Sequence, residues 1–253
     1  MVGRRQPSIS LQSYLQFAPR VDRTRVLRRY LGRSPKTLPV LKAWKSFRTD
    51  EIVSPSSDFC VEGFPFSANT FAYYSVLDAN PRLSGGHHTH LEGQVKRAVR
   101  LGIPTALVIR DPRDAVESLA VFDGGQAAAR HFVTVWADYH ERLSKVIEDG
   151  AVVVCPFDRV VGDEAFTVRA INARFRAGFA LPTSSSEEIS RQAREMRISR
   201  GMASRDTYAD SFPESLDELR AAIGNHPDTP RALEIYEWAC DFAPDEEELA
   251  ISS

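Results

Sequence analysis

Apolar residues recur along this chain with two spacings, which predict two kinds of element. Short, mainly apolar runs predict buried strands at Phe59–Glu62, in a segment that leads into a histidine cluster, at Thr105–Ile109 and at Ala151–Cys155. A longer stretch from Gln126 to Glu148 has apolar residues three or four positions apart and predicts a helix, which Gly150 would end. Its apolar face comprises Phe132, Val135, Trp136, Tyr139, Leu143 and Val146.

The remaining helices predicted from Asp58 onward alternate with these strands. They are expected at Asn69 to about Asp78, Glu92 to about Leu101, Arg113 to about Phe122, Ala165–Phe179, from Glu187 on, at Glu214–Gly224 and at Arg231–Phe242. Residues 199–213 lack a clear period and predict a long loop. Alternation of strands and helices is typical of an α/β fold with a central parallel sheet flanked by helices.

The chain divides into a basic lead-in and one larger domain. Residues 1–50 carry twelve Lys or Arg against two acids, and we expect a partly helical segment folded onto the rest. This segment could contact a partner subunit, an anionic lipid or the acidic tail of a neighbouring copy, although a solvated face is the commoner explanation. Residues 51–253 are predicted to form a single α/β domain.

Composition narrows the classes of function. A formal net charge of -2 gives no sign of a nucleic-acid binder. No stretch approaches the ~20 apolar residues that span a bilayer. Cys60, Cys155 and Cys240 are scattered without metal-ligand spacing, so we expect no metal and a reducing, cytoplasmic setting.

Two strand-loop-helix segments have the chemistry of anion sites. In the first, Gly63 and Pro65 shape a turn that offers Ser67 and Thr70 hydroxyls at the start of a helix, where backbone amides favour anions. In the second, Arg110 ends an apolar strand. The first segment lacks the Lys of a Walker A loop, which argues against ATP hydrolysis.

These two segments resemble the sulfotransferase family, whose donor is 3′-phosphoadenosine 5′-phosphosulfate (PAPS). The first matches the family's 5′-phosphosulfate loop over Phe64-Pro65-Phe66-Ser67-Ala68-Asn69-Thr70-Phe71, and the second matches its 3′-phosphate motif over Arg110–Asp114 with Ser118. A weaker match covers residues 152–160. The resemblance implies a P-loop-NTPase-like sulfotransferase fold, with PAPS or its product PAP (3′-phosphoadenosine 5′-phosphate) bound and no metal required.

The resemblance also assigns roles to individual residues. It implies that Pro65 to Phe71 hold the phosphosulfate, that Arg110 and Ser118 hold the 3′-phosphate, and that Phe71 stacks on adenine. Two alternatives stay open: Arg110 could pair with Asp114 or Asp158, and Phe71 could be a core residue.

Three histidines lie between the two anion segments, at positions 87, 88 and 90. The family places its general base at the position of His90, and a neutral imidazole can accept the proton of an attacking hydroxyl near neutral pH. His88 is the second candidate, on the same side of a segment expected to be extended. Metal binding and plain packing are the alternatives for this cluster.

The sequence departs from the family's pattern in two places. Phe66 stands where the family carries Lys or Arg, and an apolar ring cannot neutralise charge on a leaving phosphate. Arg200 and Gly201 are the best local candidates for the family's late loop over the 3′-phosphate, but the Lys of that loop is missing.

The sequence therefore predicts transfer of a sulfuryl group to a hydroxyl or amine of a small-molecule or glycan acceptor, with self-association left open. One alternative is a non-catalytic module that binds PAP, PAPS or a protein and has lost the loop cation. Another is a kinase-like phosphotransferase, which the missing Walker lysine opposes.

Overall fold

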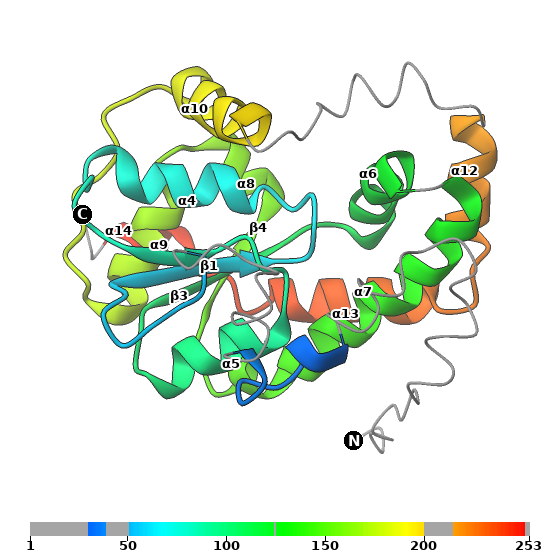
Figure 1. Ribbon diagram of the computed structural model, residues 1–253, viewed down its shortest axis with the longest axis horizontal. Helices are drawn as coiled ribbons and strands as arrows, with labels where there is room; N and C mark the ends of the chain where they lie inside the picture. Colours follow the sequence, from blue (N-terminus) through cyan, green and yellow to red (C-terminus); the bar gives the residue numbers. More distant parts are fainter. Residues whose placement is uncertain (1–29, 39–50, 124, 200–214, 251–253) are drawn as a thin grey trace.

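The computed structural model describes residues 30–38, 51–123, 125–199 and 215–250. Its centre is a four-stranded sheet, all parallel, in the order β2-β1-β3-β4. The strands are β1 (Phe59–Gly63), β2 (Gly85–His87), β3 (Thr105–Ile109) and β4 (Val153–Pro156). This sheet, with helices on both faces, confirms the predicted α/β class (Figure 1).

Helices cover each face of the sheet because the strands are apolar on both sides (Figure 1). Ala106 and Val108 of β3 enter one core cluster and Leu107 and Ile109 the other, as alternation along a strand requires. The first cluster contains residues of α4 (Asn69–Asp78), α8 (Phe157–Gly162), α9 (Phe166–Phe175), α10 (Ser186–Ser199) and α14 (Glu246–Ala250). The second contains residues of α5 (Glu92–Arg100), α6 (Pro112–Asp123), α7 (Gly125–Glu148), α12 (Leu216–Gly224) and α13 (Thr229–Cys240).

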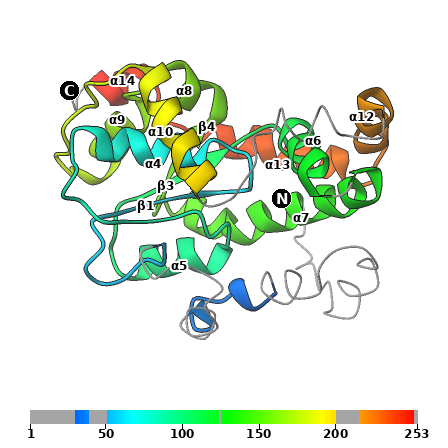
Figure 2. The same cartoon turned by 45° about the horizontal axis from the view of Figure 1, so that its top comes forward.

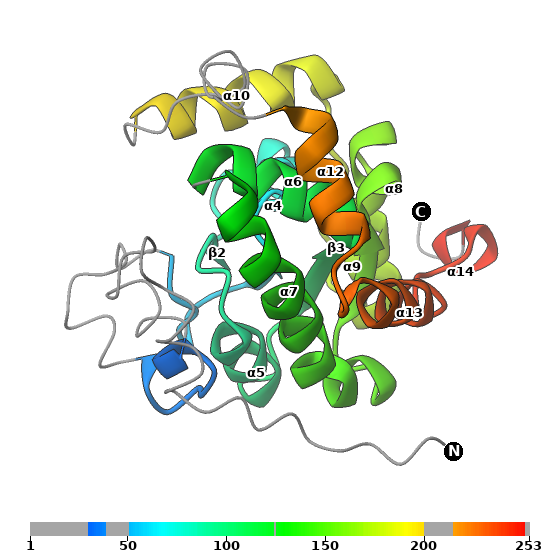
Figure 3. The ribbon, with the colours of Figure 1, turned by 90° about the vertical axis from the view of Figure 1, so that its right-hand side faces the viewer.

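Helix α7 is the central helix of the group that contributes to the second core cluster. Helices α6, α12 and α13 pack along it (Figure 3). Phe132, Trp136 and Leu143 from its predicted apolar face are buried. The helix also carries a buried ionic network, in which Asp138 accepts from Arg142 at 3.1 Å and from Arg231 of α13 at 3.0 Å. The burial of its predicted apolar face confirms that the spacing of apolar residues predicted this helix correctly.

Several element boundaries differ from the prediction, and two of them have a clear cause in the backbone. Strand β4 begins at Val153, not Ala151, because Gly150 takes a φ of 60° and the amide of Ala151 is used by the end of α7, bonding to Val146 O at 2.9 Å. Helix α9 ends at Phe175, not Phe179, because Arg176 adopts a left-handed conformation. Helices α8 and α14 were not predicted.

Residues 30–38 of the basic lead-in pack on the domain beside α5 (Figure 2). Leu38 is fully buried with Ile52 and Leu91. A side chain at Gly93 would collide with the backbone of Gly32, so the two segments approach as closely as only glycine permits. This contact fixes the position of Arg33 next to the loops described below.

Candidate functional site

The carboxyl ends of β1, β2 and β3 bring the predicted site residues to one edge of the sheet. Residues 64–68 follow β1, the histidine segment follows β2, and Arg110 follows β3. Parallel strands place their carboxyl ends together, which is where open α/β sheets bind ligands. The register pairs Val61 with His87 and Gly63 with Val108, so the three loops start at nearly the same height.

The loop after β1 is a tight turn with two residues in left-handed conformation. Phe66 has a φ of 64° and Ala68 a φ of 63°. Gly63 is required at the start of the turn, because a Cβ there would collide with the Val108 carbonyl. The Asn69 amide closes the turn by donating to the carbonyls of Gly63 at 3.2 Å and Phe64 at 3.0 Å.

The amino end of α4 has the features of an anion site. Its cap residue, Ala68, offers no side-chain hydrogen bond, so the amides of the first turn are not capped by it. Ser67 is fully buried, and within the described residues its hydroxyl has no hydrogen-bond partner. Thr70 lies half-buried on the first turn. A phosphate or sulfonate would supply the acceptor that the Ser67 hydroxyl needs.

Arg110 links the loop after β1 to helix α6. Its Nη1 atom donates to the Phe66 carbonyl at 2.9 Å and to Ser118 Oγ at 3.3 Å. The guanidinium also lies over the Phe157 ring, 4.3 Å from its centroid. The structure thus brings Arg110 and Ser118 together, as predicted, and connects them to the first anion segment.

Phe66 and Phe71, two of the three aromatic residues of the first segment, pack against other parts of the protein. The Phe66 ring lies 5.6 Å from the Phe122 ring of α6 and against the second core cluster. Phe71 is 8 % exposed and belongs to the first core cluster with Phe59 and Val61. The packing alternative therefore accounts for the position of Phe71, and adenine stacking stays a prediction. Pro65 is half-buried at the mouth of the turn.

The histidine segment is not extended, which corrects the predicted geometry. His88 has a φ of 57° and His90 a φ of 54°, so the backbone turns twice. The two rings nevertheless meet edge to face with centroids 4.8 Å apart. The His87 ring stacks instead on the Tyr73 ring, with the two ring centroids 3.8 Å apart.

The His90 ring is held to the root of the loop after β1. Its Nδ1 atom lies 2.9 Å from the Gly63 carbonyl, a contact in which Nδ1–H donates. Asn69 Nδ2 is also 3.3 Å from Nδ1, but that amide already donates to two carbonyls. The proton on Nδ1 leaves the lone pair on Nε2, which is the form needed in a general base.

Glu62 at the end of β1 is a site residue that the sequence prediction missed. It is fully buried, and its carboxylate accepts hydrogen bonds from Thr89 N, Thr89 Oγ1 and His90 N. Burial raises its pKa to about 7, although these hydrogen bonds favour the charged form. An acid inside an otherwise apolar strand was the signal that could have identified it.

The raised pKa of Glu62 predicts that stability falls as pH rises through neutrality. The ordinary value is 4.5 and the folded value about 7, so the folded state binds the proton more tightly between these values. We expect the free energy of unfolding to fall by about 2 kcal/mol from pH 5.5 to pH 8 because of this group. Urea unfolding at both pH values would measure it, with Glu62→Gln as control. An equal pH dependence in the variant would contradict the assignment.

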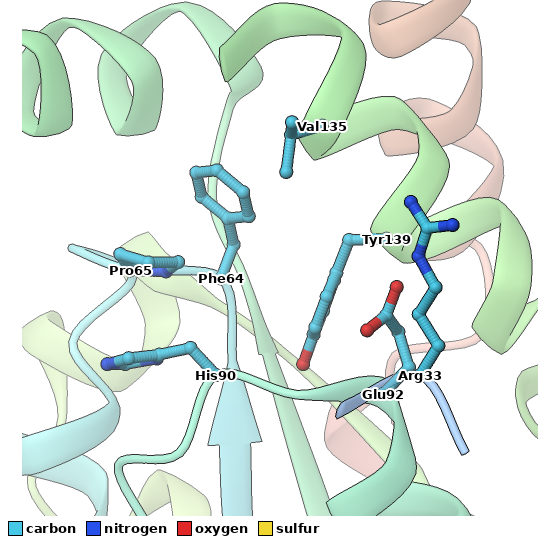
Figure 4. A pocket seen from close by; sticks show the side chains of 7 residues that line it. All are labelled: Arg33, Phe64, Pro65, His90, Glu92, Val135 and Tyr139. Atoms are coloured by element: carbon cyan, nitrogen blue, oxygen red, sulfur yellow. The ribbon is translucent and has the colours of Figure 1, made fainter. Parts of the chain in front are cut away.

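A narrow pocket opens beside the loop after β1 (Figure 4). Tyr139 of α7 points into it and is 3 % exposed, and its hydroxyl has no hydrogen-bond partner within the described residues. Glu92 in the wall is paired with Arg142 at 3.2 Å. The lining residues are Arg33, Phe64, Pro65, His90, Glu92, Val135 and Tyr139. The sequence prediction placed Tyr139 on the apolar face of a helix and gave it no role at the site.

Two predicted site residues, Arg200 and Gly201, lie outside the described residues. Across the described ranges, no group of three or more His, Cys, Asp or Glu side chains is arranged to hold a metal ion. No helix in those same ranges is long and apolar enough to cross a bilayer.

Comparisons with protein-family models, with curated proteins and with solved structures found no match to this chain.

Proposed function

We propose that this protein is a sulfotransferase of P-loop-like fold, which moves a sulfuryl group from PAPS to a hydroxyl or amine of a small acceptor. One observation carries the proposal: a continuous set of contacts joins the three groups of residues that the reaction needs. His90 bonds to Gly63 at the root of the first anion loop, and Arg110 bonds to Phe66 within that loop and to Ser118.

The donor would occupy the loop after β1 and the space next to Arg110. The Ser67 hydroxyl and the first-turn amides of α4 suit the phosphosulfate, because they are hydrogen-bond donors in a buried setting. Arg110 suits the 3′-phosphate, because its planar cation donates several hydrogen bonds at once. Ser118 adds a neutral hydroxyl at the same place.

In the transfer step, the acceptor oxygen forms a bond to sulfur while the bond from sulfur to the phosphate oxygen breaks. PAP leaves with that electron pair, and the acceptor proton passes to Nε2 of His90. The contact between Nδ1 and Gly63 supports this role, since it keeps Nε2 in the accepting form.

The pocket that His90 and Tyr139 line has a volume of about 10 Å³, about that of one water molecule, so only the reacting hydroxyl or amine of an acceptor would enter it. Phe64, Pro65 and Val135 give this pocket apolar walls, and the Tyr139 hydroxyl offers one buried polar contact.

The test is conversion of PAPS to PAP in the presence of a panel of small alcohols and phenols, followed by mass spectrometry of the sulfated product. We expect acceptor-dependent release of PAP and a product heavier by one sulfuryl group. Binding of PAP without product from any acceptor class would favour the alternative below.

Phe66 favours one alternative, a non-catalytic module that binds PAP or PAPS. Its ring packs on Phe122, so the position offers no charge to a leaving phosphate. If the scaffold is otherwise catalytic, Phe66→Lys should raise the transfer rate about 10- to 100-fold, because a cation at this position stabilises the developing charge.

The matched control for this prediction is Phe66→Leu, which loses the ring without adding charge. Initial rates at saturating PAPS would be compared for the three proteins. An unchanged rate in a folded Phe66→Lys protein that still binds PAP would mean that the loop cation is not what limits transfer.

A further inference from the structure

Glu62 is the only acidic residue of β1, a strand that is otherwise apolar and buried. All five residues of β1 are buried, and Glu62 is fully buried near the carboxyl end of the strand. Taking a carboxylate out of water costs free energy that only hydrogen bonds or an opposite charge can offset. The partners of this carboxylate therefore indicate what it does.

Three of the hydrogen bonds to this carboxylate come from the histidine segment, and the backbone of Gly63 provides a further one. Oε1 accepts from Thr89 N and Thr89 Oγ1, both at 2.8 Å, and Oε2 accepts from His90 N at 2.9 Å. Glu62 lies two residues before the loop that carries Ser67 and directly before Gly63, which binds the His90 ring. Glu62 therefore binds the backbone amide of His90, and the neighbouring Gly63 carbonyl binds the ring of the same residue.

The histidine segment needs such a contact because its backbone is strained. His88 and His90 both adopt left-handed conformations, with φ of 57° and 54°. Residues other than glycine take up this conformation at a cost, and it persists where surrounding contacts hold it. The hydrogen bonds to Glu62 lie between and beside the two strained residues.

We propose that Glu62 is a positioning residue for His90: its ionised carboxylate holds residues 88–90 in the left-handed turn that brings Nδ1 of His90 onto the Gly63 carbonyl and so fixes the tautomer of the ring. The inference rests on the proposed function for its purpose, but its geometry can be tested without turnover.

The charge state of Glu62 decides how firmly the segment is held. The ionised carboxylate accepts from all three donors, whereas protonation turns one oxygen into a donor facing an N–H or O–H group. Cys60 of β1 and Tyr139 of α7 are titratable groups that interact with it electrostatically. Both have raised pKa values and stay neutral at neutral pH, so they add no competing charge. The hydrogen bonds that position Thr89 and His90 should therefore weaken as pH falls below about 7.

The test is ¹⁵N–¹H NMR of the histidine rings at pH 8 in the wild type, Glu62→Gln and Glu92→Gln. Glu92 is the matched control, a buried acid that pairs with Arg142. We expect His90 in the Nδ1–H tautomer in the wild type and in Glu92→Gln, and a mixture of tautomers in Glu62→Gln. A Glu62→Gln protein that keeps the wild-type tautomer would overturn the proposal, as would an Nε2–H tautomer in the wild type.

Thr89→Val provides a second measurement if Glu62→Gln does not fold. It removes one of the three hydrogen bonds, and we expect exchange of the His90 amide to become about fivefold faster. Unchanged exchange would count against the proposal. Calorimetric titration with PAP, run on the same samples, separates the two ideas: absence of PAP binding would refute the proposed function while the tautomer result still decides the role of Glu62.

Discussion

Replacing His90 with asparagine should lower sulfuryl transfer by about 10²- to 10⁴-fold, the usual contribution of a positioned general base. Asparagine is preferred to alanine because it tolerates the left-handed conformation that His90 adopts, at a φ of 54°. The variant lacks a group that can take up the acceptor proton. Its affinity for PAP should stay within about twofold of the wild type, because the donor contacts are made by other residues.

The matched control is His88→Asn, since His88 has a similar backbone conformation and its ring lies 4.8 Å from that of His90. We expect a much smaller loss there. Rates with PAPS and PAP titrations would be measured on both variants. Full activity in His90→Asn would exclude His90 as the base, and equal losses in both would mean that the pair acts as a unit.

Replacing Arg110 with alanine should weaken PAP binding by about 100-fold or more. A guanidinium that makes charge-assisted hydrogen bonds to a phosphate contributes about 1.5–3 kcal/mol per bond, and two such bonds exceed the free energy of a hundredfold change. The variant would also lose the bonds from Arg110 to Phe66 O and Ser118 Oγ, which join the two anion segments.

Arg113→Ala is the control for charge, since this side chain is 57 % exposed and pairs with Asp111 at 2.7 Å. It should leave PAP affinity nearly unchanged. Thermal melting of both variants would show that the fold is intact. If the two substitutions weakened binding equally, the contribution of Arg110 would be general electrostatic attraction, not a specific contact.

Much of the fold could be predicted from local patterns. The period of α7 and the apolar runs of β1 and β3 are properties of single segments, so sequence alone located them. The errors came from backbone geometry that propensity does not encode. Gly150 was expected to end α7, but the extension of that turn to Ala151 depends on a hydrogen bond to Val146.

The candidate site was predictable where it depends on order along the chain. Parallel strands bring their carboxyl ends together, so loops at residues 64–68, 88–90 and 110 had to meet. Tyr139 could not be recognised because its role depends on burial and on partners from other elements. Glu62 stood out as an acid in an apolar strand, but its binding partners in the histidine segment could not be predicted from the sequence. The expected extended form of the histidine segment was wrong for the same reason: contacts from β1 hold His88 and His90 in strained conformations.

The most direct test of the central claim is a calorimetric titration of the full chain with PAP, with ATP and magnesium as the comparison ligand. PAP and ATP share an adenosine, but they differ in the 3′-phosphate that Arg110 and Ser118 are proposed to hold. We predict saturable binding of PAP that is at least about tenfold tighter than that of ATP with magnesium. Preference for ATP with magnesium, or no binding of PAP, would contradict the assignment of this site.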